Sequence, residues 1–509
     1  MRQFINSMLE ARTVSSEAAE TCAAKLLGPS HRLEVALQVL GGQESASQVA
    51  RDLGVSRKFV GQQTAKAEVA LQQAFATPPA ADDEVLFELP VTQRWVRSLV
   101  LGLTLICHSS QRGVVELLRD LFDLPLSLGS VHNILAAAVA QARPHNAAVD
   151  LDRVRIGAFD EIFQNGQPVL VGCDVDSTYC YLLSLEEHRD TDTWGTRLLE
   201  LVDRGFAPQT TVADFGHALR AGLREALPHT KCRGDLFHAL HALHRVMEIA
   251  DNQAYRDINA HARLQARQQK HCYHHGRKNL SVSSQAVHTA RAQAASVQRA
   301  DDIRLLVEWL HHDIWSIAGP DLAERRELFD FVLAELKQRQ VPGSLTMSGT
   351  LYSLEHHRDD LLEFVVELEG ELARLAAQFQ VEPDLLRQLL HHQADHPDRP
   401  EYWQREAQLH RQAHGRLHEL HAAIEALATR TVRGSSIVEN LNSRLRSYFF
   451  LRRHLGSNYL ELLQFFLNHR RFLRSERPDR ANRSPRELLT GDPHPHWLQL
   501  LGYQRFERN

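Results

Sequence analysis

Three short apolar segments constrain the fold most, because the connections between them are too short for anything but neighbouring strands. The first covers 154–163, the second 169–173 and the third 178–185. An Asn165-Gly166 pair lies in the first connection, and Asn-Gly between apolar strands is typical of a tight hairpin. We therefore expect the three segments to form an antiparallel meander.

The residues after the meander change to helical periodicity. Segments 193–205 and 217–227 each predict a helix, and the apolar run 210–215 between them predicts a fourth strand. This β-β-β-α-β-α order predicts an α/β core with a mixed sheet. We expect the fourth strand to lie beside the first.

Two aspartates lie at or near the ends of strands in this expected sheet. Asp160 is on the first strand, and Asp214 ends the fourth. If the strands are neighbours, the two carboxylates come close together, which is unfavourable unless a cation lies between them. Carboxylate oxygen is the ligand that Mg²⁺ prefers, and paired ions of this kind serve phosphodiester chemistry. Either aspartate alone is more simply a solvated strand end, but the shared context favours a metal site.

Composition limits the classes of protein. The chain has 509 residues, 43% of them hydrophobic, so it is long enough for several domains. A net charge of −5 gives no global argument for nucleic acid, so local patches must carry one. Six cysteines without a CxxC pair fit a reducing compartment. With no signal-peptide pattern and no long apolar run, we expect a cytoplasmic protein without a membrane partner.

The segment 45–60 has the pattern of a helix-turn-helix. Apolar positions alternate with polar ones at helical spacing, Gly54 permits the turn, and Ser56 is suited to cap the second helix. Side chains suited to phosphates and base edges follow on that helix. They are Arg57, Lys58, Gln62 and Lys66. A plain helical hairpin with a polar face is the alternative, and the pattern favours DNA binding.

A linker is expected at 77–83, and a second helical unit follows it. Within this unit, 129–135 resembles the start of another recognition helix, although few cations accompany it. DNA contact and plain packing both remain open there.

Later in the core, 231–237 is expected to form the fifth strand. Asp235 and His238 would then lie beside the metal site, or serve only as a strand end and a helix cap. The long segment that follows is helical in character, too long for a loop, and rich in histidine. A structural metal around 271–275 is conceivable, but no second ligand pair stands at a suitable spacing, so solvated histidines are favoured.

A helix beginning near Ser435 carries one acid among many arginines. Glu439 shares a face with Asn442 and Ser443. Between Arg430 and Arg486 there are thirteen arginines and four acidic residues. Arginine matches phosphate geometry, and we expect DNA contacts from this region. The candidates are Arg444, Arg446, Arg452 and Arg453.

The domain organisation follows from these segments. We expect a DNA-binding domain at 1–76, a second helical and possibly DNA-binding domain at 84–148, and a core at 150–245 that is completed by basic helices at 430–509. An all-α insertion at 246–429 would interrupt that core.

The chain resembles the DDE transposases of bacterial insertion sequences, which have a ribonuclease-H-like core. The resemblance rests on five features in a fixed order along the chain. They are Asp160, Asp214 after 214 − 160 = 54 positions, the Asp235-to-His238 run, the helix with Glu439 and the late 484–489 segment. The gap of 439 − 214 = 225 positions before the third acid requires an inserted helical domain, which some members have.

The resemblance implies an enzyme that binds double-stranded DNA at the ends of its element. It would cleave there with Mg²⁺ or Mn²⁺ and join the free 3′-hydroxyl to target DNA. Asp160, Asp214 and Glu439 would be the catalytic metal ligands, with Asp235 and His238 as accessory residues. It also implies a homodimer or higher assembly at the nucleoid. A DNA-binding regulator with an inactive, transposase-derived core is the alternative, and a nuclease without strand transfer is another.

Overall fold

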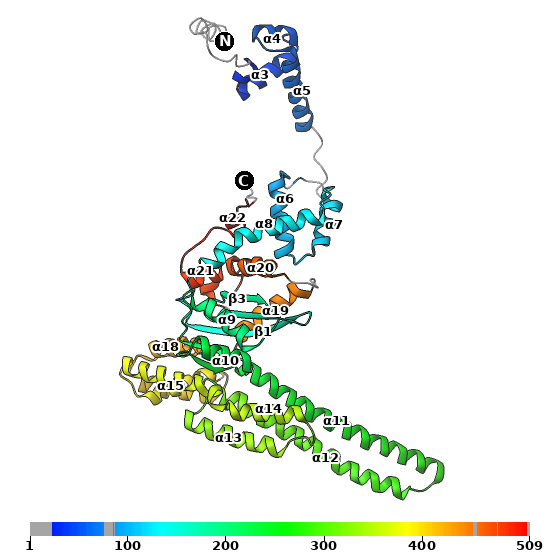
Figure 1. Ribbon diagram of the computed structural model, residues 1–509, viewed down its shortest axis with the longest axis vertical. Coiled ribbons are helices and arrows are strands. Elements are labelled where there is room, and N and C mark those ends of the chain that lie inside the picture. The colour runs from blue at the N-terminus through cyan, green and yellow to red at the C-terminus, as the bar shows by residue number, and fades with distance from the viewer. Residues whose placement is uncertain are drawn as a thin grey trace. The chain divides into compact units, whose positions relative to one another are not determined.

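The computed structural model describes residues 23–75, 85, 87–395, 397–450, 456–475 and 477–505. The chain divides into two units, Met1–Pro90 and Val91–Glu507, and each is described by itself (Figure 1). The expected linker at 77–83 and the cations Arg452 and Arg453 lie outside the described residues.

The first unit is helical. Its helices are α2 (Ala23–Leu26), α3 (Pro29–Leu40), α4 (Ala46–Asp52) and α5 (Arg57–Ala74). The Ser45 and Ser56 side chains cap α4 and α5 by accepting hydrogen bonds from the third residue beyond each serine. Gly54, with φ +60°, makes the short turn between these helices. Val49 and Val60 are buried where they pack together.

A five-stranded mixed sheet is the centre of the second unit. Its strands are β1 (Ile156–Gln164), β2 (Gln167–Asp174), β3 (Cys180–Leu185), β4 (Thr210–Ala213) and β5 (Lys231–Gly234). The order is β3-β2-β1-β4-β5; β1, β2 and β3 pair antiparallel, whereas β1, β4 and β5 pair parallel. The expected meander, the tight turn at Asn165-Gly166 and the neighbouring first and fourth strands are therefore confirmed.

Both faces of the sheet are covered, which explains why its strands read as nearly continuous apolar runs. One face packs on α9 (Thr191–Val202) and α10 (His217–Ala226), with Phe159 of β1 in this core. The other face, with Ala158 of β1, packs on α19 (Ser436–Phe450) and α20 (Ser457–His469).

Helices of the expected second helical domain share that second core. They are α6 (Gln93–Leu105), α7 (Gln111–Phe122) and α8 (Leu128–Ala147). Val131 and Leu135, in the segment considered as a recognition helix, are buried in it. Packing therefore accounts for the apolar pattern of this segment.

A long series of helices separates β5 from α19. They are α11 (Leu236–His275), α12 (Leu280–Trp309), the π-helix η2 (Leu310–Ile314), α13 (Leu322–Gln338), α14 (Leu345–His356), α15 (Arg358–Phe379), α16 (Pro383–Ala394), α17 (Pro400–Gln412) and α18 (Leu417–Arg430). The expectation that β5 continues to Phe237 is wrong. The Asp235 side chain accepts a hydrogen bond from Phe237 N–H and starts α11 directly after the strand.

Short helices end the chain: the 3₁₀ turn η3 (Pro478–Arg480), α21 (Pro485–Thr490) and α22 (Trp497–Leu500). Ser484 and Glu487 form a capping box at the start of α21. Among the described helices, none combines the length and apolar character that a bilayer-crossing helix needs.

Candidate active site

Asp160 and Asp214 lie at matching positions of two neighbouring parallel strands. In the register of β1 and β4, Ala158 is the partner of Val212. Two residues further along come Asp160, which belongs to the same face of β1 as Ala158, and Asp214 on the neighbouring segment. Asp160 is still within β1, whereas Asp214 directly follows the last residue of β4.

The Asp160 carboxylate is buried and held from both sides. Its Oδ1 accepts a hydrogen bond of 2.8 Å from Glu161 N–H, and its Oδ2 accepts one of 2.6 Å from Asn442 Nδ2. Burial raises the pKa of Asp160 to about 7, and the nearby Glu439 and Asp214 charges add to this effect, while His238 opposes it. A carboxylate in this position is stabilised by a positive charge beside it.

Helix α19 brings Glu439 to Asp160. Its buried side, with Val438, Leu441 and Leu445, packs into the sheet core. Glu439 and Asn442 are one turn apart, so both lie beside Asp160, at the middle of β1. Glu439 Oε1 lies 3.7 Å from His238 Nε2, and the exposed Arg446 places Nη1 3.7 Å from the other Glu439 oxygen.

His238 is the third member of this group. It lies on the first turn of α11, with Nε2 3.9 Å from Asp160 Oδ1 and Nδ1 2.6 Å from Asp235 Oδ2. Burial alone would lower the pKa of His238, but the Asp235 hydrogen bond and the charges of Asp235, Asp160 and Asp214 outweigh burial and raise it to about 9. The raised pKa favours the protonated ring, which places a positive charge beside Asp160.

Asp235 is fully buried and links two distant segments. Its Oδ1 accepts from the N–H groups of Phe237 and Ser435, both at 2.9 Å. Its Oδ2 accepts from the Ser435 hydroxyl and lies beside His238 Nδ1. Burial would raise the pKa of Asp235, but these hydrogen bonds outweigh burial and lower it. The first turn of α11 and the start of α19 are thus joined through one carboxylate.

Among the residues that the structure describes, Asp160, His238 and Glu439 form a group that could hold a metal ion. Their ligand atoms all lie within 4.8 Å of one another. The donor set fits a divalent cation, because two carboxylates and one imidazole are common ligands. Buried Asn442 Oδ1 has no hydrogen-bond partner in the described part of the chain, so the site also offers an unused oxygen.

Asp214 is not in this three-residue group. Its Oδ1 accepts a hydrogen bond of 2.9 Å from Gly216 N–H, in the turn that leads into α10. Its charge still acts on both Asp160 and His238. The structure therefore brings Asp160 and Glu439 together with the accessory His238, and leaves Asp214 at the rim.

The predicted DNA-binding residues differ in exposure. On α5, Arg57, Lys58, Gln62 and Lys66 are all exposed. On α19, Arg446 is exposed, but Arg444 is half-buried and burial lowers its pKa. The segment 271–275 forms ring contacts between histidines, and no metal-ligand group was found there among the described residues.

Asn442 and Ser435 contact the site residues, although the sequence predicted only that Ser435 could cap the helix and that Asn442 shares the face of Glu439. The signal for Asn442 was its spacing of three from Glu439, which put it on the same helix face. The partnership of Ser435 with Asp235 spans 200 positions and has no local signal.

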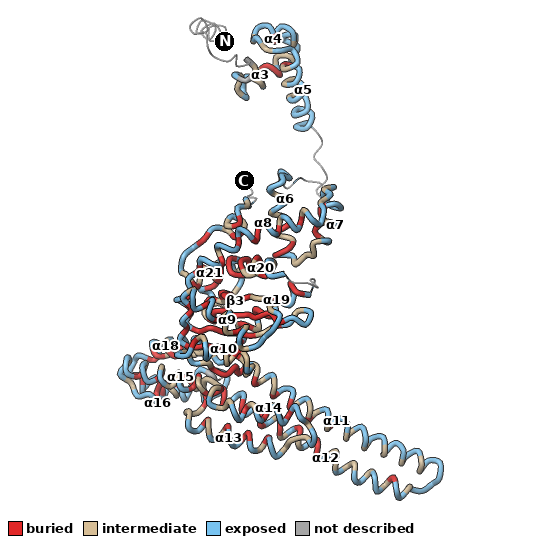
Figure 2. Tube along the Cα trace, viewed as in Figure 1, coloured by how far each residue is buried: buried red, intermediate tan, exposed pale blue. Residues whose placement is uncertain are grey.

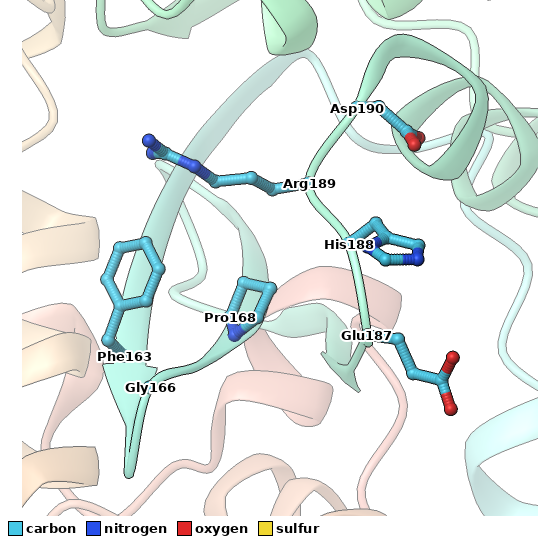
Figure 3. A pocket seen from close by; sticks show the side chains of 7 residues that line it. All are labelled: Phe163, Gly166, Pro168, Glu187, His188, Arg189 and Asp190. Atoms are coloured by element: carbon cyan, nitrogen blue, oxygen red, sulfur yellow. The ribbon is translucent and has the colours of Figure 1, made fainter.

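A surface pocket of about 440 Å³ lies away from this group (Figure 3). It is lined by Phe163, Gly166, Pro168, Glu187, His188, Arg189 and Asp190. The Arg189 guanidinium lies 5.3 Å from the centre of the Phe163 ring and pairs with Glu161. Phe163 and Glu161 alternate with Asp160 along β1, so they belong to the opposite face of the sheet.

No family model matches the chain, and no curated protein matches it. Among solved structures, it is similar to the Drosophila P element transposase strand transfer complex. The identity is 12% and the TM-score 0.29, over 79% of this chain and 98% of that chain. A similarity of this size carries no weight for function, so any functional assignment depends on the side-chain geometry of the site.

Proposed function

We propose that the chain is a DDE-type DNA transposase with a ribonuclease-H-like core. One observation carries the proposal: Asp160 and Glu439, 439 − 160 = 279 positions apart, meet beside His238 at the middle of the central strand β1. A sheet of this strand order, with an acid at the end of the neighbouring strand, supports the same proposal.

The site residues would hold and orient a divalent ion, Mg²⁺ or Mn²⁺. When bound, such an ion activates a water or a 3′-hydroxyl and stabilises the leaving oxygen of a phosphodiester. Asp160 and Glu439 would be its ligands, joined by Asp214 from the adjacent strand end. Asn442 and the Glu161 N–H fix the orientation of the Asp160 carboxylate, which keeps its oxygens aimed for this task.

The proposed substrate is double-stranded DNA at the ends of an element. The first unit would read it through a helix-turn-helix formed by α4 and α5. Lys58, Gln62 and Lys66 recur every four residues along α5, so they lie on one exposed face. Arg446, whose Nη1 lies 3.7 Å from Glu439, would contact a phosphate near the reacting bond.

The direct test uses a duplex that carries the sequences flanking the gene on both sides. With Mg²⁺ present, we expect breaks that leave a free 3′-hydroxyl and products joined to a target plasmid. With a chelator in place of Mg²⁺, both should disappear. Binding without any cleavage would support a regulator instead, and cleavage without joining would support a nuclease.

Replacing Arg57 and Lys58 by alanine should weaken binding to the same duplex. If each contacts one phosphate, the slope of log affinity against log salt should fall by about 1.8, because each contact contributes roughly 0.9. Binding isotherms at several salt concentrations measure it. Unchanged affinity and slope would show that α5 does not contact the DNA.

A further inference from the structure

Helices α11 and α12 form a long antiparallel hairpin, and its outer part has little core of its own. Buried residues of α11 end at Ala254, and between Val282 and Ser296 no residue of α12 is buried. Figure 2 shows the outer parts of both helices as mostly exposed or intermediate. We call residues 252–300 the arm.

The arm is strongly basic in a chain whose net charge is −5. It contains eight Lys and Arg residues and a single acid, Asp257. The cations are Arg256, Arg263, Arg267, Lys270, Arg277, Lys278, Arg291 and Arg299. A solvated helix usually mixes both signs, so the single sign needs another reason.

The cations of the arm form no ion pairs with other described residues, unlike several cations in the rest of the helical insertion. There, Arg326 pairs with Asp359, Lys337 with Glu355, and Arg358 with Asp330. Like charges three or four residues apart, as at Arg263 and Arg267, destabilise a helix by a few tenths of a kcal/mol. An external negative charge would offset this repulsion.

Four of the cations form a stripe along α11. Arg256, Arg263, Arg267 and Lys270 are spaced by seven, four and three residues and are all exposed. At 100° per residue they fall within an arc of about 60° and extend over about 21 Å. One DNA strand presents a phosphate about every 3.4 Å of duplex axis, so the length of the stripe corresponds to about six phosphates along one strand.

We propose that the arm is a second DNA-binding element, which holds the phosphate backbone of duplex DNA without reading its sequence. This proposal rests on the proposed function, because the arm would give the enzyme a second contact with its DNA substrate. Exposed Tyr255 and Tyr273 add hydrogen-bonding groups on the arm.

The test replaces Arg263, Arg267 and Lys270 together by glutamine, which keeps a good helix former at each position. Binding of the full chain to a long duplex of mixed sequence is measured without Mg²⁺. We expect weaker binding and a salt slope lower by about 2.7, roughly 0.9 for each lost phosphate contact.

The matched control replaces Arg326, Lys337 and Arg358 by glutamine. This variant loses the same charge from the same insertion, but its cations are already paired, so its salt slope should stay near that of the unchanged chain. Equal effects in both variants, or an unchanged slope in the arm variant, would overturn the proposal. So would an arm variant that keeps DNA affinity but loses self-association, because the arm would then bind a second copy.

The two proposals fail in different ways. If the arm variant binds the mixed duplex as well as the unchanged chain and both cleave with Mg²⁺, only the arm proposal is wrong. If neither protein cleaves the flanking duplex, yet the arm variant alone loses affinity, the arm proposal stands and the catalytic one is wrong.

Discussion

Replacing Asp160 by asparagine should leave the protein folded and able to bind duplex DNA, but should lower Mg²⁺-dependent cleavage by about 10⁴-fold, a typical loss when one member of a catalytic unit is removed. Asparagine has the same shape: its oxygen can accept from Glu161 N–H, and its N–H₂ can donate to the unpartnered Asn442 Oδ1 once the Asn442 amide turns over. It lacks the charge that a divalent ion requires. Glu439→Gln should behave alike, because Glu439 belongs to the same group.

The losses should not add, since the residues serve one site. The double variant Asp160→Asn, Glu439→Gln should therefore be about as inactive as either single one. Asp214→Asn is the informative third case. A loss as large as that of Asp160→Asn would make Asp214 a ligand of the ion, although its side chain accepts a hydrogen bond from Gly216 N–H in the structure.

Controls for this experiment come from α18. Glu419 and Glu425 are exposed glutamates in the helix before α19, and they are the other candidates for the third acid. Glu419→Gln and Glu425→Gln should cleave at a near-normal rate. Near-normal cleavage by Glu439→Gln would refute its assignment and transfer the search to these two positions. Cleavage is followed on the flanking duplex, with binding measured separately.

Local patterns were enough to predict the sheet. The Asn165-Gly166 turn fixes the β1–β2 hairpin, and alternating or continuous apolar runs mark the other strands. The Asp160 and Asp214 positions follow from strand register. The direction of a side chain beyond a strand end does not, which is why the turn of Asp214 toward Gly216 was not foreseen.

Exposure on α19 was harder to predict than the position of Glu439. Arg444 and Arg446 are both basic and two residues apart, yet only Arg446 is exposed. Helix geometry turns them about 200° from each other, so both cannot face the same surface. Their shared basic character predicted the same role for both, whereas burial separates Arg444 from Arg446.

The contact between Asp235 and Ser435 could not be read from the sequence at all. The two residues are 200 positions apart, on opposite sides of the helical insertion. A contact of this kind depends on how close the first and last residues of the helical insertion lie in the folded chain.

Asp235→Asn should lower the cleavage rate by about 10²-fold, because a displacement of about 1 Å in a catalytic group can cost that much. The new amide N–H₂ would replace an oxygen that now accepts from the Ser435 hydroxyl and faces His238 Nδ1. The new N–H₂ group would then face the Ser435 hydroxyl donor at the start of α19, one turn before Glu439. Because the bond that raises the pKa of His238 is lost, that pKa should also fall from about 9.

Asp235 is not one of the three candidate ligands and contacts the group only through His238 Nδ1, so it would act by positioning. We expect kcat to fall while KM and DNA affinity stay nearly constant. The free energy of unfolding should also fall by about 1–3 kcal/mol, because a buried polar group is left without its partner. NMR titration of the His238 ring would measure its pKa. A variant that unfolds less easily or cleaves normally would contradict this role.

Two further substitutions separate geometry from charge. Ser435→Ala removes the hydroxyl but keeps the Ser435 N–H bond to Asp235, so its effect should be smaller than that of Asp235→Asn. Gly434→Ala leaves every charge in place, but the added Cβ would lie 2.8 Å from Asp235 Oδ1 and 3.0 Å from Phe237 N, so the start of α19 must shift. It should therefore lower kcat as Asp235→Asn does, without the fall in the His238 pKa. If Gly434→Ala cleaves normally, displacement of α19 is not what carries the Asp235 effect, and the change at His238 must account for it.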